Sequence, residues 1–379
     1  MKVFFFGQAT GGNALLWFNF LNNKFKSNKN LDITFLARTL CTLKCSFKVF
    51  SPYGYKKLPK IIQKLRNKAA SLFLLDLYLA FLRRKGIQDL LILQGNYTPT
   101  SNMKVLMKIP YKTSILNIYG SDFYRKYLRK ELNNNELKQF VQVLNKVDVI
   151  HCNWHTTKYD FLNEFPQFSD KVICCPWGAD LDWYKYGMKP RSENDNKVFL
   201  STRALHSYNN VELVVEAFCR AFPSDTNHRL HVVGAYGCDP TVLNKIHTLI
   251  TEYNHSKNIK IEIDKWYEGR DLMNLYDSAD YNVCFGSTDQ LTISIVYAFL
   301  RGIKNILSPL DNYHYLNQLG FKTQWICKDI SVESLKNTFL YLVDNSFEKS
   351  DIKNDEKLAR KVFNLETVFN QYVEKIDEK

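Results

Sequence analysis

The chain has 379 residues, a formal net charge of +13, 45% hydrophobic residues and 23% charged residues. The length exceeds what one hydrophobic core usually organises, and the composition is that of an ordinary soluble globular protein, so we expect two domains. The excess of positive charge indicates an anionic partner, which is nucleic acid, a phospholipid surface or a phosphorylated substrate.

Several patterns argue against a membrane span, a zinc site and secretion. The longest apolar run, 72–82, is interrupted by Asp76 and is too short to cross a bilayer. The nine cysteines form no CxxC pair and no Cys/His cluster at zinc spacing. No secretory signal precedes the first apolar strand. We therefore expect a cytoplasmic protein with reduced thiols and no metal site.

The first half of the chain alternates apolar strands with helical stretches. Strands are expected at 2–6, 31–36, 89–93, 113–118, 147–150 and 172–174. Polar or glycine-containing segments follow several of them. This βα repeat predicts a doubly wound parallel sheet with its functional loops at one edge.

The first of these loops is rich in glycine. Residues 7–13 (GQATGGN) connect the first strand to an aromatic helix expected at 14–21. Backbone N–H groups at such a helix start can hold a phosphate, which makes Gly12 a candidate binding residue. The loop has neither a G-x-G-x-x-G nor a Walker pattern, so a simple tight turn is the alternative.

Lysine and arginine are concentrated between residues 55 and 85, where only Asp76 opposes them. Apolar residues recur at helical spacing among these charges. A basic amphipathic helix is typical of a membrane-surface element, so an anionic membrane surface is an expected partner of residues 56–85. The alternative is a solvated helix face on a lysine-rich protein.

The polar run 185–197 lacks apolar periodicity and predicts a linker between domains. The βα pattern restarts after it, with strands expected at 198–201, 230–233, 259–263, 281–285 and 303–307. We therefore expect one domain at 1–186, a second at 187–350 and a C-terminal helix within 351–379.

The segment 284–309 predicts a strand, a polar turn, a helix from Gln290 and a second strand. This unit places Asp289 at a helix N-terminus at the carboxyl edge of the sheet, where ligands bind in open α/β folds. Asp289 either caps the helix or contacts a ligand. The N–H groups of Gln290 and Leu291 would face an anion there.

This segment resembles the donor-site motif of retaining glycosyltransferases of family 4, which have the GT-B fold of two Rossmann-like domains facing across a cleft. Ser287 and Asp289 match the opening of the motif. Ala298, Phe299 and Gly302 match its end. Further segments that look like the family's loops, in the same order, are Gly11-Gly12, Gly120-Ser121-Asp122 and Pro176 to Asp180. The resemblance spans nearly the whole chain and implies that the C-terminal helix packs back toward the first, acceptor-side domain.

The resemblance also implies an activity. Such enzymes pass a sugar with retention from a nucleotide-diphosphate sugar to a glycan or lipid-linked acceptor, as in surface polysaccharide synthesis, without a metal or other cofactor. The departing diphosphate needs fixed positive charge, and Arg203 matches the family's phosphate arginine. Tyr208 stands where the family usually has a lysine, so Asn209, Lys265 or Lys304 is expected to assist.

Three residues are catalytic candidates on this resemblance. Asp289 would hold hydroxyls of the transferred sugar, Asp122 would orient or deprotonate the acceptor, and His155 would donate to a phosphate. Tyr297 replaces the glutamate that grips the ribose, and a tyrosine cannot accept hydrogen bonds bidentately. Either Trp266 or its neighbour Tyr267 could stack on the base or pack at the rim.

Two other functions remain as alternatives. Tyr297 and the missing lysine favour a non-catalytic GT-B partner or regulatory subunit. A nucleic-acid-binding protein is permitted by charge, but the sequence has no zinc-finger, helix-turn-helix or RNP-type pattern, so nucleic acid is not an expected partner.

Overall fold

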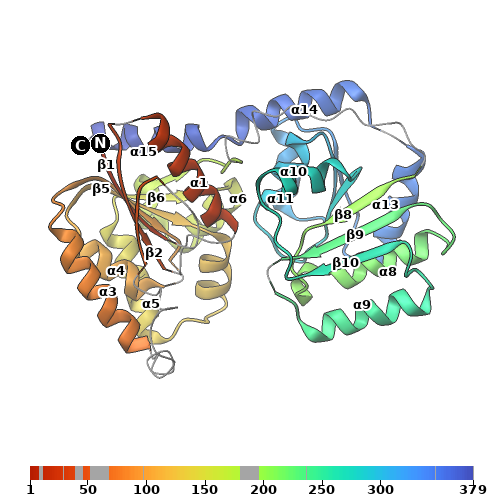
Figure 1. Cartoon of the computed structure of the whole chain (residues 1–379), viewed down its shortest axis with the longest axis horizontal. Helices are drawn as coiled ribbons and strands as arrows, with labels where there is room; N and C mark the ends of the chain where they lie inside the picture. Colours follow the sequence, from red (N-terminus) through yellow and green to blue (C-terminus); the bar gives the residue numbers. More distant parts are fainter. Residues whose placement is uncertain are drawn as a thin grey trace. The chain divides into compact units, whose positions relative to one another are not determined.

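The computed structural model describes residues 1–7, 12–28, 30–38, 46–51, 68–96, 98–179, 196–235, 237–345 and 347–378. The chain divides into two compact units. Unit 1 consists of Met1–Asp180 and Asn364–Lys379, and unit 2 consists of Leu181–Phe363. Each unit contains one parallel sheet with helices packed on it (Figure 1), so the predicted α/β architecture is confirmed. Most of the predicted linker, residues 52–67 of the basic region and Gly11 lie outside the described residues.

Unit 1 has a seven-stranded sheet in the order β3-β2-β1-β4-β5-β6-β7, and every neighbouring pair is parallel. The strands are β1 (Lys2–Gly7), β2 (Asp32–Ala37), β3 (Lys48–Phe50), β4 (Gln88–Gln94), β5 (Tyr111–Ile118), β6 (Val149–Cys152) and β7 (Val172–Cys174). The sheet includes all six predicted strands of this half and adds β3. Nearly continuous apolar strands are what a sheet buried on both faces requires.

The helices of unit 1 bury the two faces of this sheet. They are α1 (Gly12–Ser27), α3 (Lys68–Arg83), α4 (Pro99–Lys108), α5 (Asn134–Lys146), α6 (His155–Glu164) and α15 (Leu365–Asp377), with a π-helix η1 (Ser121–Leu128) and a 3-10 helix η2 (Pro166–Lys171). Phe4 and Phe6 of β1 share a core with Leu75 and Leu79 of α3. Phe5, between them, contacts Trp17 of α1 on the opposite face, as strand alternation requires.

Unit 2 has a six-stranded parallel sheet in the order β10-β9-β8-β11-β12-β13. Its strands are β8 (Val198–Ser201), β9 (Arg229–Gly234), β10 (Ile259–Ile263), β11 (Tyr281–Cys284), β12 (Lys304–Leu307) and β13 (Gln324–Ile326). Its helices are η3 (Ser207–Asn209), α8 (Val211–Ala221), α9 (Pro240–Glu252), α10 (Gly269–Asp277), α11 (Ile293–Leu300), α12 (Asp311–Gln318), α13 (Val332–Asp344) and α14 (Lys349–Val362). The chain order reverses between β8 and β11, the switch point where such sheets bind ligands.

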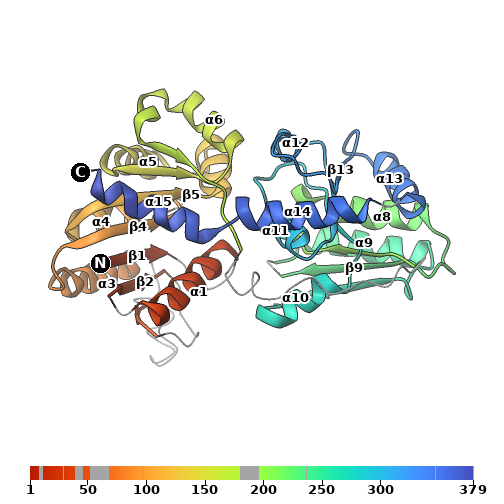
Figure 2. The same cartoon turned by 90° about the horizontal axis from the view of Figure 1, so that it is seen from above.

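The C-terminal region differs from the single helix predicted within 351–379. It forms two helices, of which α14 packs on α11 in unit 2 and α15 belongs to unit 1. The break falls at Asn364, whose side chain accepts a hydrogen bond from the backbone N–H of Glu366 at 2.9 Å and so caps α15. Figure 2 shows α15 lying over β4 and β5, which it contacts.

A buried polar cluster attaches α15 to the sheet of unit 1. The Tyr372 hydroxyl lies 2.5 Å from Asn117 Oδ1 and 2.6 Å from His151 Nδ1, and its ring stacks on Trp17 at 5.6 Å. The other ring nitrogen of His151 lies 2.7 Å from the carbonyl oxygen of Cys175. A carbonyl only accepts, so Nε2 carries the proton. The Trp177 indole N–H, which only donates, points at Nδ1 from 3.4 Å, so Nδ1 is an acceptor. The cluster therefore requires a neutral histidine.

We predict that this cluster makes unit 1 sensitive to acid. Burial lowers the pKa of His151 to about 4, whereas an unfolded histidine has a pKa of about 6.5. Between these values the unfolded chain binds more protons, so stability falls as pH drops from 6.5 to 4, by up to about 3 kcal/mol. Urea unfolding of the wild type and of His151→Gln at pH 7 and pH 5 isolates this contribution, because Asp122, whose raised pKa acts in the opposite direction, is present in both proteins. The wild type should lose stability relative to the variant at pH 5. An unchanged pH dependence in that variant would contradict the assignment.

The described part of the chain contains no helix that is both long enough and apolar enough to cross a membrane. Seven cysteines of this part are free thiols.

Candidate functional site

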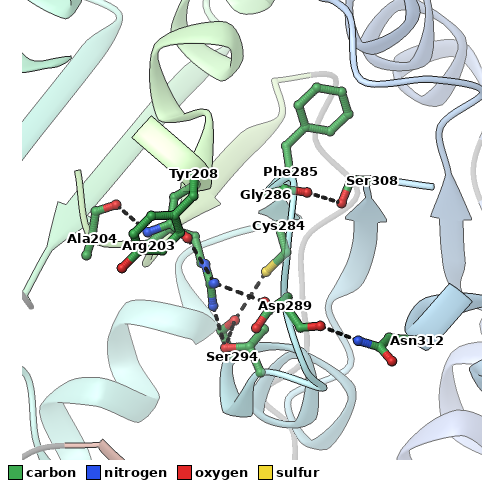
Figure 3. A network of polar contacts seen from close by, with 12 residues as sticks. Arg203, Ala204, Tyr208, Cys284, Phe285, Gly286, Asp289, Ser294, Ser308 and Asn312 are labelled. Carbon is green, nitrogen blue, oxygen red and sulfur yellow. Dashed lines mark hydrogen bonds and ion pairs between the residues drawn. The ribbon is translucent and has the colours of Figure 1, made fainter. Parts of the chain in front are cut away.

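Arg203 lies in the loop after β8, at the carboxyl edge of the unit 2 sheet (Figure 3). Its Nη1 donates to Thr292 Oγ1 at 2.7 Å, and its Nη2 donates to Asn209 Oδ1 at 3.0 Å. The same Nη2 pairs with Asp289 Oδ2 at 2.9 Å. Burial disfavours the charge of Arg203, but the Asp289 carboxylate raises the pKa of the guanidinium, which stays charged. A fixed cation is therefore present at the edge where the sequence predicted one.

Asp289 is the counter-ion of Arg203. Its Oδ2 also accepts a hydrogen bond from the Tyr313 hydroxyl at 2.8 Å, and its backbone carbonyl accepts one from the Asn312 side chain. Burial raises the pKa of the Asp289 carboxyl, and the Arg203 guanidinium partly opposes this rise. Asp289 is thus held by side chains from the loop after β8 and from α12, which fixes its position beside the cation.

The loops after β8 and β11 are joined by backbone contacts. The Tyr208 carbonyl accepts hydrogen bonds from the N–H of Ser287 at 2.9 Å and from its hydroxyl at 3.2 Å. Asn210 donates to the carbonyl of Phe285 at 3.0 Å. A Cβ at Gly286 would lie 3.2 Å from the Tyr208 carbonyl oxygen, so the close approach favours glycine. These contacts fix the position of Arg203 relative to Asp289.

The helix expected from Gln290 begins three residues later. Helix α11 starts at Ile293, and Thr292 occupies the N-cap position with φ −73° and ψ 144°. Asp289 is therefore not the cap, and Gln290 and Leu291 precede the helix. This prediction was wrong because the Asp289 carboxylate is bound to Arg203 and Tyr313, which sequence spacing did not reveal. An anion at Arg203 would instead lie beside the Thr292 hydroxyl.

Of the predicted donor-binding residues, Arg203 and Asn209 meet in this cluster and two others lie apart from it. Lys265 follows β10, is exposed and pairs with Glu262 at 2.6 Å. Tyr297 is buried in α11 and its ring packs edge-on against Tyr276 at 5.7 Å. Lys265 is thus a poor replacement for the missing lysine, and Tyr297 serves the packing of α11.

The remaining predicted residues belong to unit 1. Asp122 is fully buried at the start of η1, and its Oδ2 accepts a hydrogen bond from the backbone N–H of Asn96 at 2.6 Å. Burial raises its pKa to about 7. It positions the Asn96 loop and does not itself reach the surface. His155 is the exposed first residue of α6, and partial burial lowers its pKa. Gly12 is the first residue of α1.

Sequence reasoning missed Thr292, Asn312 and Tyr313. Thr292 lies within the predicted helix segment, and its role appears only once the helix start is known. The other two residues begin α12, which follows β12. Polar residues just beyond a neighbouring strand of the same sheet are the signal that would have found them.

Residues 187–360 match the family model described as glycosyl transferases group 1. This match covers most of unit 2, including Arg203, Asp289 and Tyr313. No curated protein matches the chain.

Solved structures resemble the whole chain at low sequence identity. Sucrose-phosphate synthase from Thermosynechococcus elongatus has a TM-score of 0.75 at 12% identity, covering 100% of this chain and 98% of that one. Anabaena HepE in complex with UDP-glucose has a TM-score of 0.69 at 13% identity, covering 100% of both chains. A variant of S. aureus TarM in complex with UDP has a TM-score of 0.72 at 10% identity, covering 99% of this chain and 100% of that one. The fold of this chain is GT-B.

The group 1 match and the GT-B fold agree with the resemblance seen in the sequence. Within the described residues, no group of three His, Cys, Asp or Glu is placed to hold a metal ion. The positive charge in the described site of unit 2 comes from Arg203.

Proposed function

We propose that this protein is a glycosyltransferase that takes a sugar from a nucleotide-diphosphate sugar. The group 1 match covers the unit that contains the Arg203 cluster. Neighbours of the same fold were solved with UDP and with UDP-glucose, which supports a nucleotide-sugar donor for this chain. The acceptor we propose is a glycan or lipid-linked glycan, in surface polysaccharide synthesis at the cytoplasmic face of a membrane.

The observation that carries this proposal is the half-buried Arg203 at the carboxyl edge of the sheet, with a carboxylate already bound to it. A guanidinium that binds one oxyanion is suited to phosphate oxygens, which it contacts in the same geometry. When the sugar leaves, negative charge grows on the diphosphate, and a preformed cation stabilises that charge. The Thr292 hydroxyl and the Asn209 side chain fix the guanidinium in advance.

The other steps follow from the same residues. Diphosphate oxygens would replace the Asp289 carboxylate at Arg203 Nη2, and the freed carboxylate would accept hydrogen bonds from hydroxyls of the transferred sugar. We propose that the reaction proceeds with retention and without a metal, and that the leaving phosphate takes the acceptor proton. Asp122 would then act through the Asn96 loop, and His155 would face an acceptor phosphate from its exposed position.

A panel of nucleoside diphosphates and their sugars tests the proposal. Isothermal titration should show binding of at least one diphosphate, and incubation with the matching donor should release that diphosphate or transfer the sugar to a membrane extract. No binding by any member of the panel would contradict the donor site.

A second function is favoured by one observation. Tyr297 stands at the family's ribose-binding glutamate and is buried against Tyr276. A donor site that cannot bind the ribose bidentately fits a non-catalytic GT-B partner. Binding of a nucleoside diphosphate without donor hydrolysis or transfer would establish this alternative.

A further inference from the structure

Helix α3 carries an apolar row on its outer face. Phe73, Leu77 and Phe81 follow one another at four-residue spacing, and their side chains are 62%, 52% and 56% exposed. Ile87, just after the helix, is 59% exposed. Residues at this spacing lie along one side of a helix. Large apolar side chains grouped in this way are typical of an interaction surface.

Most of this row makes no core contact, although the Phe81 ring packs on Phe50 of β3 at 6.2 Å. The opposite side of α3 packs into the core of unit 1 through Leu75, Leu79 and Leu82, all of which are buried. Figure 1 shows α3 on the outside of unit 1 with α4 beside it. The helix is therefore held in place by its inner face, while Phe73 and Leu77 of the outer face are largely exposed.

The charges around the row are positive. Asp76 is the only acidic residue of α3, and it pairs with both Lys104 and Lys108 of α4. Arg83 and Arg84 are exposed at the end of the helix. Two cations at Asp76 and two at the helix end thus outnumber the single carboxylate. A second copy of this face would bring like charges together, so charge favours an anionic partner over self-association.

We propose that the α3 face, consisting of Phe73, Leu77, Phe81, Arg83 and Arg84, docks onto an anionic phospholipid surface. An apolar row between cations inserts at the boundary of headgroups and acyl chains while the cations contact lipid phosphates. The sequence predicted a membrane contact within residues 56–85. This proposal narrows that contact to side chains of α3 and its C-terminal end. The inference goes beyond donor binding, and either property can fail without the other.

Vesicle co-sedimentation of the full chain tests the docking face. Wild-type protein should bind phosphatidylcholine vesicles containing phosphatidylglycerol, and should bind pure phosphatidylcholine vesicles weakly. Phe73→Ser combined with Phe81→Ser should reduce partitioning about tenfold. Arg83→Gln combined with Arg84→Gln should remove most of the preference for anionic lipid. Leu128→Ser combined with Tyr159→Ser is the matched control, because these exposed apolar residues of unit 1 lie outside the α3 face.

Circular dichroism and thermal melting should show that all three double variants remain folded, since every altered side chain is exposed. Nucleoside diphosphate binding without vesicles should be the same in all of them. Wild-type-like partitioning of the Phe73/Phe81 variant would overturn the inference, as would binding that ignores anionic lipid. Sedimentation velocity provides a third check, because a wild-type dimer that the same variant dissolves would show that a second copy covers the row.

Discussion

Arg203→Ala is expected to weaken nucleoside diphosphate binding by about 100-fold, or roughly 2.7 kcal/mol. The guanidinium is preoriented by Thr292 and Asn209, and no other cation meets it in the described cluster. Its loss removes two charge-assisted hydrogen bonds to phosphate. Isothermal titration with the diphosphate identified in the panel measures the change, and donor turnover should fall by at least the same factor.

This variant also leaves the half-buried Asp289 without its cation, which lowers stability for a reason unrelated to the donor. The double variant Arg203→Ala with Asp289→Asn separates the two effects. It removes the orphaned charge, so thermal stability should largely recover, while diphosphate binding should stay weak. Recovery of binding together with stability would show that Arg203 only holds Asp289, and the donor site would then be misplaced.

Arg220→Ala provides the matched control for charge. Arg220 is an exposed arginine of α8 in the same unit and pairs with Glu216. Its removal subtracts one positive charge without touching the cluster, so the diphosphate affinity should change less than about threefold.

Asp277→Ala is expected to destabilise unit 2 by about 3 to 5 kcal/mol. Arg301, at the end of α11, donates to both oxygens of Asp277, with distances of 2.7 Å from Nε and 2.9 Å from Nη2. The side chains are only 2% and 5% exposed. Without Asp277 the guanidinium stays buried and loses its carboxylate counter-ion. Chemical unfolding of the variant measures the loss of free energy.

Two comparisons make this prediction specific. Glu216→Ala breaks the i,i+4 pair with Arg220, whose guanidinium is exposed to water, and should cost much less than the loss of Asp277. Asp277→Leu combined with Arg301→Met removes both charges and should recover much of the stability, because the site no longer contains an unpaired ion. A similar loss in the exposed and buried pairs would contradict the argument from burial.

The fold was largely predictable. Alternating apolar strands and helical stretches indicated two parallel sheets, and both sheets form with the predicted strands in place. Arg203 and Asn209 were singled out by the family resemblance and Asp289 also by its position after a strand, and they meet in one cluster. The start of α11 was misplaced by three residues, because Asp289 looked like a helix cap until its partners were known.

Local patterns of apolar and polar residues by themselves determined the strands, the doubly wound class and the edge at which polar loops gather. Those patterns depend on neighbours along the chain, and a parallel sheet brings every strand end to one edge. Only the tertiary structure decided that Asp289 is the counter-ion of Arg203 and that Thr292, 89 residues away, orients the same guanidinium. It also divided the C-terminus between the two units. These contacts join segments far apart in sequence, and their geometry exists only after the sheets have formed.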